Sequence, residues 1–344
     1  MRLSVLDQST VVTGRSPAAS IQETLALARL CEGLGYDRYW LAEHHNSASQ
    51  AGTAPEVLMA AVAATTRRIR VGSAGVMLPH YSSLKVAEVF RVLEAIAPGR
   101  IDMGLGRAPG SDGRTAYALN PAAASAADHF PSAVRDLLHW VRGEALAEGH
   151  PFRDVAAQPQ GETAPEPWIL GSSDYGAQVA AYFGLPFCFA HFITDGRGAE
   201  EALAAYREQF RPSAALPRPY AVVAVWAMAA ESEAEAARQF ASRALWRLGR
   251  DQGVYEALPS PEEAAAYPYS EAERGRVAAM RARSFAGTGP QVAEQLAALE
   301  RSLGVQEVVV LTTLHDAGAR RRSYALLAEA AGLVGAEGAR MAAE

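Results

Sequence analysis

Lysine and cysteine are scarce in this chain of 344 residues. Lys85 is the only lysine, and it lies between the apolar residues Leu84 and Val86 in a segment with helical spacing. A barrel aldolase that forms a Schiff base needs its lysine on a strand, so the sequence excludes that chemistry. Cys31 and Cys188 are far apart and form no Cys-x-x-Cys motif, which disfavours a disulfide, thiol redox chemistry and a thiolate metal site.

Long apolar runs and an excess of positive charge are also missing. No stretch of about 18 consecutive apolar residues occurs, and the segment from Met1 to Asp7 lacks the apolar core of a signal peptide. We therefore expect a cytoplasmic protein without a membrane-spanning segment. The net charge of −6, from 32 basic and 38 acidic residues, gives no general affinity for nucleic acid.

Strand-like apolar segments alternate with helical windows along almost the whole chain. This alternation favours a parallel (β/α)8 TIM barrel with insertions over an open sheet, formed as one domain over residues 1–344. We expect strands at residues 2–6, 37–42, 69–78, 101–106, 167–171, 186–192, 220–228 and 306–312. We expect helices at residues 17–34, 54–66, 83–96, 125–143, 174–183, 199–211, 232–248, 290–303 and 317–332.

Two long segments interrupt the alternation. Residues 144–166 contain several prolines and glycines, which predicts a loop before the fifth strand. Residues 249–288 are too long for an ordinary connection, and loops of that length are usually functional lids or disordered. We interpret this segment as a mobile loop insertion that closes over the strand ends, with a solvated surface excursion as the alternative.

The second predicted strand ends in Glu43-His44-His45. Because barrel active sites lie at the carboxyl ends of the strands, these side chains indicate a catalytic cluster. Adjacent residues of an extended chain point to opposite sides, so only one imidazole can readily face a central pocket. A surface histidine and a metal ligand are the competing interpretations. The first strand carries Asp7 and Gln8 where a barrel metallohydrolase would carry a His-x-His pair, so we expect no metal site.

Two further strand ends are rich in small residues. The run Gly72-Ser73-Ala74-Gly75 permits either close packing inside the barrel or a flat ligand against the backbone. Gly104 to Gly110 ends the fourth strand and contains Arg107, whose guanidinium fork matches phosphate oxygens. The segment is only superficially similar to a dinucleotide fingerprint, because Pro109 occupies the position of the third glycine.

The fifth strand passes through Gly171-Ser172-Ser173-Asp174-Tyr175-Gly176 into a helix. Free backbone amides and hydroxyls at the positive end of a helix form an anion site. A Ser or Asp that simply caps the helix is the alternative. Asp174 would be unfavourable beside a phosphate, so we expect it to cap the helix or to point away.

These motifs make the chain resemble the bacterial luciferase-like family of flavin-dependent monooxygenases. The resemblance covers residues 1–200 well, and Gly287-Thr288-Gly289 is similar to the family's end. It is carried by Trp40 to His45, Val71 to Pro79, Pro98-Gly99-Arg100 with Gly104 to Gly110, Gly171-Ser172-Ser173, and Gly184-Leu185-Pro186.

The resemblance implies FMN bound at the carboxyl face of the barrel and a catalytic role for His44. The flavin ring is expected against the backbone at Ala74 and Gly75, where the family suggests a non-proline cis peptide bond. The flavin phosphate is expected in a site made by Arg107, Ser172, Ser173, Tyr175 and Gly176.

The activity that the family implies is monooxygenation. Reduced flavin, FMNH2, reacts with O2 to form a C4a-hydroperoxide, which oxygenates a small organic substrate while the protein orients the flavin and excludes water. His44 is expected to act as general acid or base, because imidazole titrates near neutral pH. Since no nicotinamide motif is present, we expect a separate NAD(P)H:flavin reductase as partner. The family also implies a homodimer.

Two alternatives stay open. A related oxidoreductase of the same fold uses the deazaflavin F420, which has a longer anionic tail, for hydride transfer. The other alternative is a flavin-binding protein without catalytic activity, although His44 and Arg107 argue against it. The aromatic candidates for a substrate pocket, each of which could instead be ordinary core, are Tyr81, Phe192, Trp226 and Trp246.

Overall fold

Parallel strands close into a barrel in the computed structural model, which describes residues 1–108, 110–213 and 215–333. The strand order is β10-β1-β2-β3-β5-β6-β7-β8, and pairing between β8 and β10 closes the ring. The predicted (β/α)8 barrel is therefore confirmed. Its strands are β1 (Leu3–Asp7), β2 (Arg38–Leu41), β3 (Arg70–Ser73), β5 (Ile101–Gly106), β6 (Glu166–Gly171), β7 (Phe187–Ala190), β8 (Ala221–Ala230) and β10 (Glu307–Leu311).

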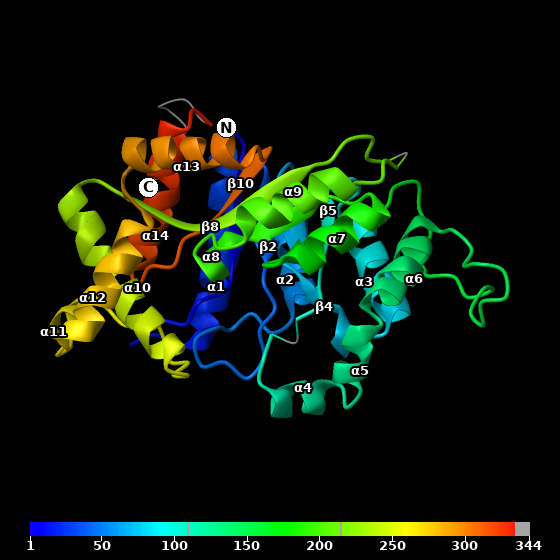
Figure 1. Cartoon of the computed structure of the whole chain (residues 1–344), viewed down its shortest axis with the longest axis horizontal. Coiled ribbons are helices and arrows are strands. Elements are labelled where there is room, and N and C mark those ends of the chain that lie inside the picture. The colour runs from blue at the N-terminus through cyan, green and yellow to red at the C-terminus, as the bar shows by residue number, and fades with distance from the viewer. Residues whose placement is uncertain (109, 214, 334–344) are drawn as a thin grey trace.

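Helices surround these strands (Figure 1). Several start at a serine whose hydroxyl accepts a first-turn backbone N–H, as Ser16, Ser82 and Ser232 do. None of the helices in the described part of the chain is long and apolar enough to cross a membrane. The helices in predicted windows are α1 (Pro17–Gly33), α2 (Pro55–Thr65), α3 (Ser83–Ile96), α5 (Ala123–Asp128), α6 (Phe130–Arg142), α7 (Asp174–Phe183), α9 (Ala199–Gln209), α10 (Glu233–Asp251), α13 (Gly289–Leu303) and α14 (Ala317–Ala330).

The strand predicted over residues 69–78 is broken into β3 and the short β4 (Val76–Met77). Between them the Ala74–Gly75 peptide bond is cis, as the family resemblance suggests. A 3-10 helix (Leu78–His80) follows β4 directly. The short helices α4 (Gly113–Leu119) and α8 (His191–Thr194) were not expected from the sequence pattern.

The expectation of an irregular insertion over residues 249–288 is wrong. This segment contains the end of α10, two helices, α11 (Pro261–Ala266) and α12 (Glu271–Ala282), and the strand β9 (Phe285–Thr288). Both helices begin with a capping box, at Ser260 and Ser270, which pairs the first free amides of such short helices. The strand β9 pairs with the second half of β8, which extends beyond the barrel. By contrast, residues 144–165 form neither helix nor strand, as predicted.

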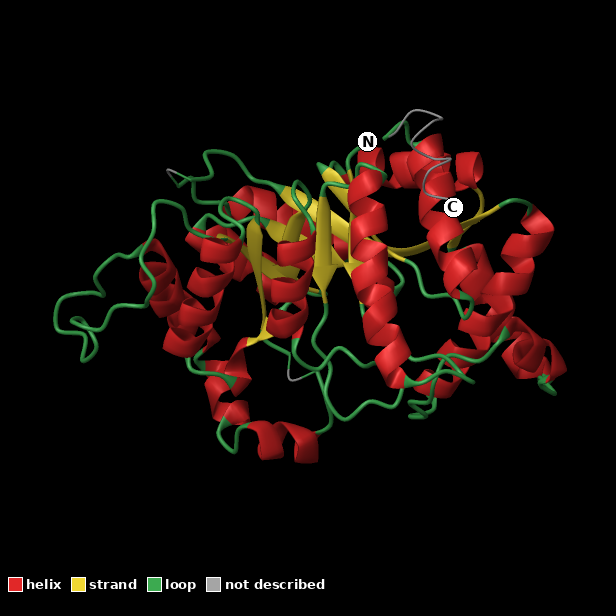
Figure 2. Ribbon diagram, turned by 180° about the vertical axis from the view of Figure 1, so that it is seen from behind, coloured by secondary structure: helices red, strands yellow, loops and turns green. Residues whose placement is uncertain are grey.

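The interior of the barrel is packed with side chains. Trp40 and Trp168 are fully buried there, with ring centroids 5.0 Å apart in an edge-on arrangement. Outward-facing residues of the same strands pack against the surrounding helices. Figure 2 shows these helices around the strands. Because the interior is filled, as in other barrels of this size, ligand binding is confined to the loops at the strand ends.

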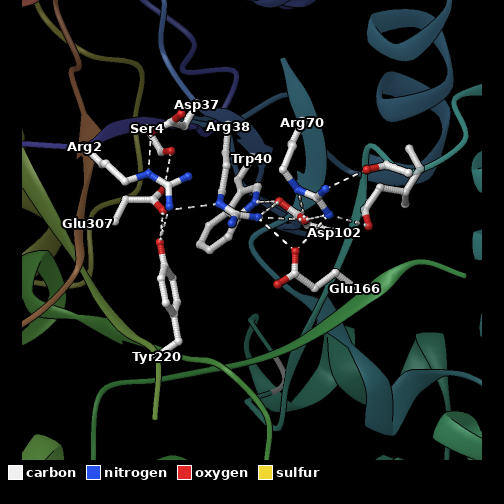
Figure 3. A network of polar contacts seen from close by, with 12 residues as sticks. Arg2, Ser4, Asp37, Arg38, Trp40, Arg70, Asp102, Glu166, Tyr220 and Glu307 are labelled. Carbon is white, nitrogen blue, oxygen red and sulfur yellow. Dashed lines mark hydrogen bonds and ion pairs between the residues drawn. The ribbon is translucent and has the colours of Figure 1, made fainter. Parts of the chain in front are cut away.

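A network of charged side chains closes the amino-terminal end of the barrel (Figure 3). Asp102 is fully buried and accepts hydrogen bonds from Arg38 at 2.9 Å, from Arg70 at 2.6 Å and from the Trp40 indole at 2.8 Å. Glu307, also buried, accepts from Arg38 at 3.3 Å. These residues lie at or near the first position of their strands, where barrel residues generally serve stability rather than catalysis.

Candidate active site

The predicted site residues lie at the opposite, carboxyl end of the barrel. His44 follows β2, the Ala74–Gly75 bond follows β3, Arg107 follows β5, and Ser172 and Ser173 follow β6. A hydrogen bond joins the segments that follow β2 and β5, since the Asn46 side chain donates to the Thr115 hydroxyl at 2.9 Å. Parallel pairing therefore places motifs that are far apart in the sequence around one opening, which we call the barrel mouth.

His44 has one ring nitrogen without a partner. Its Nε2 lies 3.3 Å from the amide nitrogen of Gln50, which can only donate, so Nε2 accepts and the proton of the neutral ring lies on Nδ1. Nδ1 is buried and has no hydrogen-bond partner among the described residues. Burial, and then the neighbouring side chains of Arg250 and His45, lower the pKa of His44 from 6.5 to about 4. That pKa lies well below the near-neutral value on which the expected role of His44 as general acid or base depends.

His45 makes different contacts from its neighbour. Its Nε2 lies 2.8 Å from the carboxylate of Glu43, which is buried. Glu43 also accepts from the Tyr81 hydroxyl at 2.6 Å and from the Met77 backbone N–H at 3.0 Å. This arrangement joins the end of β2 to β4 and gives His45 a structural partner. No group of three or more His, Cys, Asp or Glu side chains in the described ranges could hold a metal ion.

Arg107 and the start of α7 form a second group at the mouth. The Arg107 side chain is exposed, and its guanidinium carbon lies 4.0 Å from the centroid of the Tyr175 ring. Ser173 is the N-cap residue of α7, but its hydroxyl makes no capping hydrogen bond. A Cβ atom on Gly176 would lie 3.4 Å from the Gly171 Cα, an ordinary contact distance, so the first turn of α7 packs closely against the end of β6. A cation, a hydroxyl that does not cap the helix and helix amides are thus brought together, which suits an anion. Pro109 lies outside the described residues.

Packing between strands explains most of the small residues near the cis bond. A Cβ atom on Gly72 would lie 2.6 Å from the Asp102 Cβ, and one on Gly75 would lie 2.8 Å from the Gly104 carbonyl oxygen. Both positions therefore require glycine whether or not a ligand binds. Ala74 is half-buried beside them and is the residue of this run whose side chain is partly open.

A cavity of about 230 Å³ lies across the mouth, between the ends of β1, β7, β8 and β10; we call it the mouth cavity. Three of the four aromatic candidates, Phe192, Trp226 and Trp246, contribute to its lining. Trp226 is also part of the barrel core, and its indole N–H donates to the Thr313 hydroxyl at 2.9 Å. The structure does not bring Tyr81 to this cavity, because its hydroxyl is held by Glu43.

The sequence interpretation missed three arginines that also line the mouth cavity. Arg243, Arg247 and Arg250 recur on α10 at intervals of four and three residues, which places them on one face of the helix. That spacing was visible in the sequence as a basic stripe. It carried no functional meaning until the structure placed this face of α10 against the mouth.

Comparison with known proteins supports this view of the fold. A model of the family described as luciferase-like monooxygenase matches residues 1–307. The chain belongs to the luciferase-like monooxygenase family. The monooxygenase is 44% identical over 329 residues to the uncharacterized protein YwcH of Bacillus subtilis (strain 168), covering 95% of this chain and 98% of YwcH. It is 38% identical over 333 residues to the N-acetyl-S-alkylcysteine monooxygenase of the same strain, covering 96% and 98% of the two chains. The predicted family and enzyme class are confirmed, and a non-catalytic role is no longer retained.

Solved structures show the same fold. Apo-MsnO8 has a TM-score of 0.88 at 38% identity, over 97% of this chain and 99% of that one. A Type II Baeyer–Villiger monooxygenase in complex with FMN has a TM-score of 0.69 at 18% identity, over 96% of this chain and 97% of that one. An F420-dependent secondary alcohol dehydrogenase in complex with an F420-acetone adduct has a TM-score of 0.65 at 13% identity, over 97% and 99%. Two solved proteins with this fold are therefore complexes with FMN and with an F420 adduct.

Proposed function

We propose that this monooxygenase binds FMN in its reduced form at the barrel mouth and uses it with O2 to oxygenate a small organic substrate. The observation that carries the proposal is the group formed by Arg107, Ser173 and the start of α7, which offers an exposed cation and an unused hydroxyl to a phosphate. When bound, reduced flavin supplies the activation of oxygen. From the N-acetyl-S-alkylcysteine monooxygenase we carry over only the type of reaction, not the substrate.

Each group of residues at the mouth has its own proposed role. Arg107 and the Ser173 hydroxyl bind the phosphate together with the amides near Tyr175 and Gly176, and Ser172 lies in the same turn. The backbone at Ala74 and Gly75 supports the flavin ring. The mouth cavity, on the opposite side of the opening, receives the substrate and excludes water from it.

His44 is the proposed catalytic residue. A neutral ring whose Nε2 already accepts from Gln50 presents an N–H donor at Nδ1, and that donor has no partner among the described residues. A buried donor without a partner costs about 1–3 kcal/mol, which a ligand oxygen would recover. Nδ1 is covered by the surrounding protein, so contact with a ligand requires the ring or its cover to rotate. The neutral His44 ring then holds its Nδ1 proton at the reacting oxygen and does not act as a charged imidazolium.

The proposed partners are a separate flavin reductase and a second copy of the chain. The sequence contains no dinucleotide fingerprint, so we keep a separate NAD(P)H:flavin reductase as the source of reduced flavin. A cytoplasmic location also stays a prediction. For the proposed homodimer, a shallow apolar groove between α2 and α3 offers a surface. Val57, Val92 and Ile96 there are 63%, 48% and 45% exposed.

F420-dependent hydride transfer is the second candidate. The observation in its favour is the row of arginines at the mouth cavity, which could face a longer anionic tail. The two cofactors differ in that tail, so binding separates the candidates directly.

Flavin titration of the purified protein tests the proposal. We expect FMN and FMNH2 to bind more tightly than riboflavin, because riboflavin lacks the phosphate. The Arg107→Ala variant should lose about 1.5–3 kcal/mol, or roughly tenfold to a hundredfold in FMN affinity, while its weak riboflavin binding stays unchanged. Arg114→Ala, an exposed arginine in α4, serves as the matched control. Equal affinities for riboflavin and FMN, or tight binding of F420 alone, would overturn the assignment.

A further inference from the structure

Three arginines of α10 meet at the mouth cavity, and two of them have partners. Arg247 forms an ion pair with Asp251 at 3.3 Å and donates to the Phe192 backbone carbonyl at 3.3 Å. Arg250 donates to the Ser49 hydroxyl at 3.3 Å. Their charges therefore contribute to holding α10 and its neighbouring loops in place.

Arg243 differs from both. Its side chain is only 7% exposed, and its guanidinium carbon lies 4.1 Å from the centroid of the Trp226 ring. It forms neither a hydrogen bond nor an ion pair with any residue in the described ranges. The nearby carboxylates have other partners: Asp251 pairs with Arg247, and Asp195 lies 3.9 Å from Arg283.

A buried cation without a counter-ion is costly, so a purely structural role explains Arg243 poorly. Burial and then the charge of Arg247 lower the pKa of Arg243 to about 9, and the charges of Asp195 and Asp251 offset only part of this effect. The side chain is still charged at neutral pH. Stacking on Trp226 offsets part of the cost and fixes the plane of the guanidinium. The fork is thus oriented and buried, and it lines a cavity that also contains an aromatic ring, Phe192.

We propose that the substrate of this monooxygenase is a small carboxylate, whose charged group pairs with Arg243 and whose apolar part lies against Phe192. This inference rests on the proposed function, because it assigns the substrate class of the same mouth. A planar carboxylate matches the guanidinium fork with two parallel hydrogen bonds. The acid supplies the missing counter-ion on binding, so recognition and charge compensation occur together.

Calorimetric binding of matched ligand pairs tests the proposal on the full chain. The panel runs from acetate to phenylacetate, each with its neutral amide, in the presence and absence of FMN. The variants are Arg243→Met, which keeps the stem over Trp226, and Arg243→Lys, which keeps the charge without the fork. Arg238→Met is the control, since Arg238 lies on the same helix but is paired with Glu235 at the surface. Melting temperature and FMN affinity are measured for every variant.

The wild-type protein should bind at least one carboxylate about 10- to 100-fold more tightly than its amide. Arg243→Met should remove that preference, Arg243→Lys should retain part of it, and Arg238→Met should match the wild type. Because the methionine removes an uncompensated buried charge, the melting temperature of Arg243→Met should equal or exceed that of the wild type, with unchanged FMN affinity.

Three results would overturn the inference: no carboxylate is preferred over its amide, the preference survives in Arg243→Met, or this variant loses FMN affinity or melts at a lower temperature. The last result would assign Arg243 to the cofactor or to stability. Failure of the wild type to bind FMN is a separate outcome that counts against the proposed function. The comparison of acids with amides does not depend on that outcome, because it is also made without FMN.

Discussion

His44 and His45 are adjacent in the sequence, yet the structure surrounds them differently. His45 is paired with the buried Glu43, whereas His44 keeps a ring nitrogen without a partner in the described chain. A residue whose partners are already present is more suited to holding the loop. A residue with an unused donor is more suited to a ligand. The contrast supports the assignment of His44, which rested on strand alternation and family resemblance.

Replacing these histidines one at a time should separate the two roles. His44→Ala should lower turnover by about 10²- to 10⁴-fold, the usual worth of positioned proton transfer, and leave FMN affinity nearly intact. His45→Ala should act mainly through stability or substrate affinity, because it breaks the contact with Glu43. The assays are steady-state oxygenation with supplied FMNH2 and thermal unfolding of both variants. Unchanged turnover in His44→Ala combined with loss in His45→Ala would reverse the assignment.

The low pKa of His44 makes the stability of the folded chain depend on pH. The unfolded chain protonates this imidazole below about pH 6.5, while the folded chain does so only near pH 4. Stability should therefore fall as the pH decreases from 6.5 towards 4, by at most about 3 kcal/mol from this group. His44→Ala, followed by denaturant unfolding at pH 7 and pH 4.5, should show a smaller acid loss than the wild type. An equal loss in both proteins would contradict the burial argument.

At the scale of elements, the segment that follows α10 is ordered but weakly held. Leu258 forms a bridge with Val12, and the Thr13 hydroxyl donates to Glu263 at 2.6 Å, so the start of the segment is anchored beside β1. The helix α12 has no buried residue. Few buried apolar contacts allow local opening at low cost. Helical structure and mobility are compatible here, and the lid function stays a prediction.

Limited trypsin digestion can test whether α12 opens. Arg274 and Arg276 lie in this helix, and cleavage after them should be fast in the ligand-free protein. Reduced flavin with a bound carboxylate should slow it several-fold if the segment closes over the mouth. Arg135 in α6, outside the segment, provides an internal reference site. Absence of cleavage in α12 without ligand, or the same rate with and without ligand, would rule out a lid.

At the scale of the whole molecule, the groove between α2 and α3 exposes apolar side chains that a monomer would leave in water. Each such side chain contributes to association when a second copy covers it. We expect a dimer in analytical ultracentrifugation and a monomer for Val92→Glu, because a charge would be buried at the centre of that surface. Tyr117→Glu, at a residue that is 67% exposed on α4, is the control. A monomeric wild type, or a Val92→Glu variant that stays dimeric, would remove this surface from the proposal.

Local sequence patterns determined the barrel. Period-2 and period-3.6 spacing, helix caps and glycine turns are properties of short segments, so all eight barrel strands lie largely within the predicted windows. The same reasoning failed for β9, because Phe285 to Thr288 is short and contains small residues. It pairs only because β8 extends far enough to receive it. Glu43 was recognised at its strand end, but its role as a partner of His45 and Tyr81 was not.

Tertiary structure alone decided which charges are compensated. Arg38 and Arg243 are both buried arginines, and nothing in their local sequence separates them. Arg38 meets Asp102, 64 positions away, and thereby seals the amino-terminal end of the barrel. Arg243 forms no ion pair with an acid in the described chain and lines the mouth cavity instead. The physical reason is that charge compensation depends on distances between distant segments, which only barrel closure establishes, whereas strand and helix formation depend on neighbours along the chain.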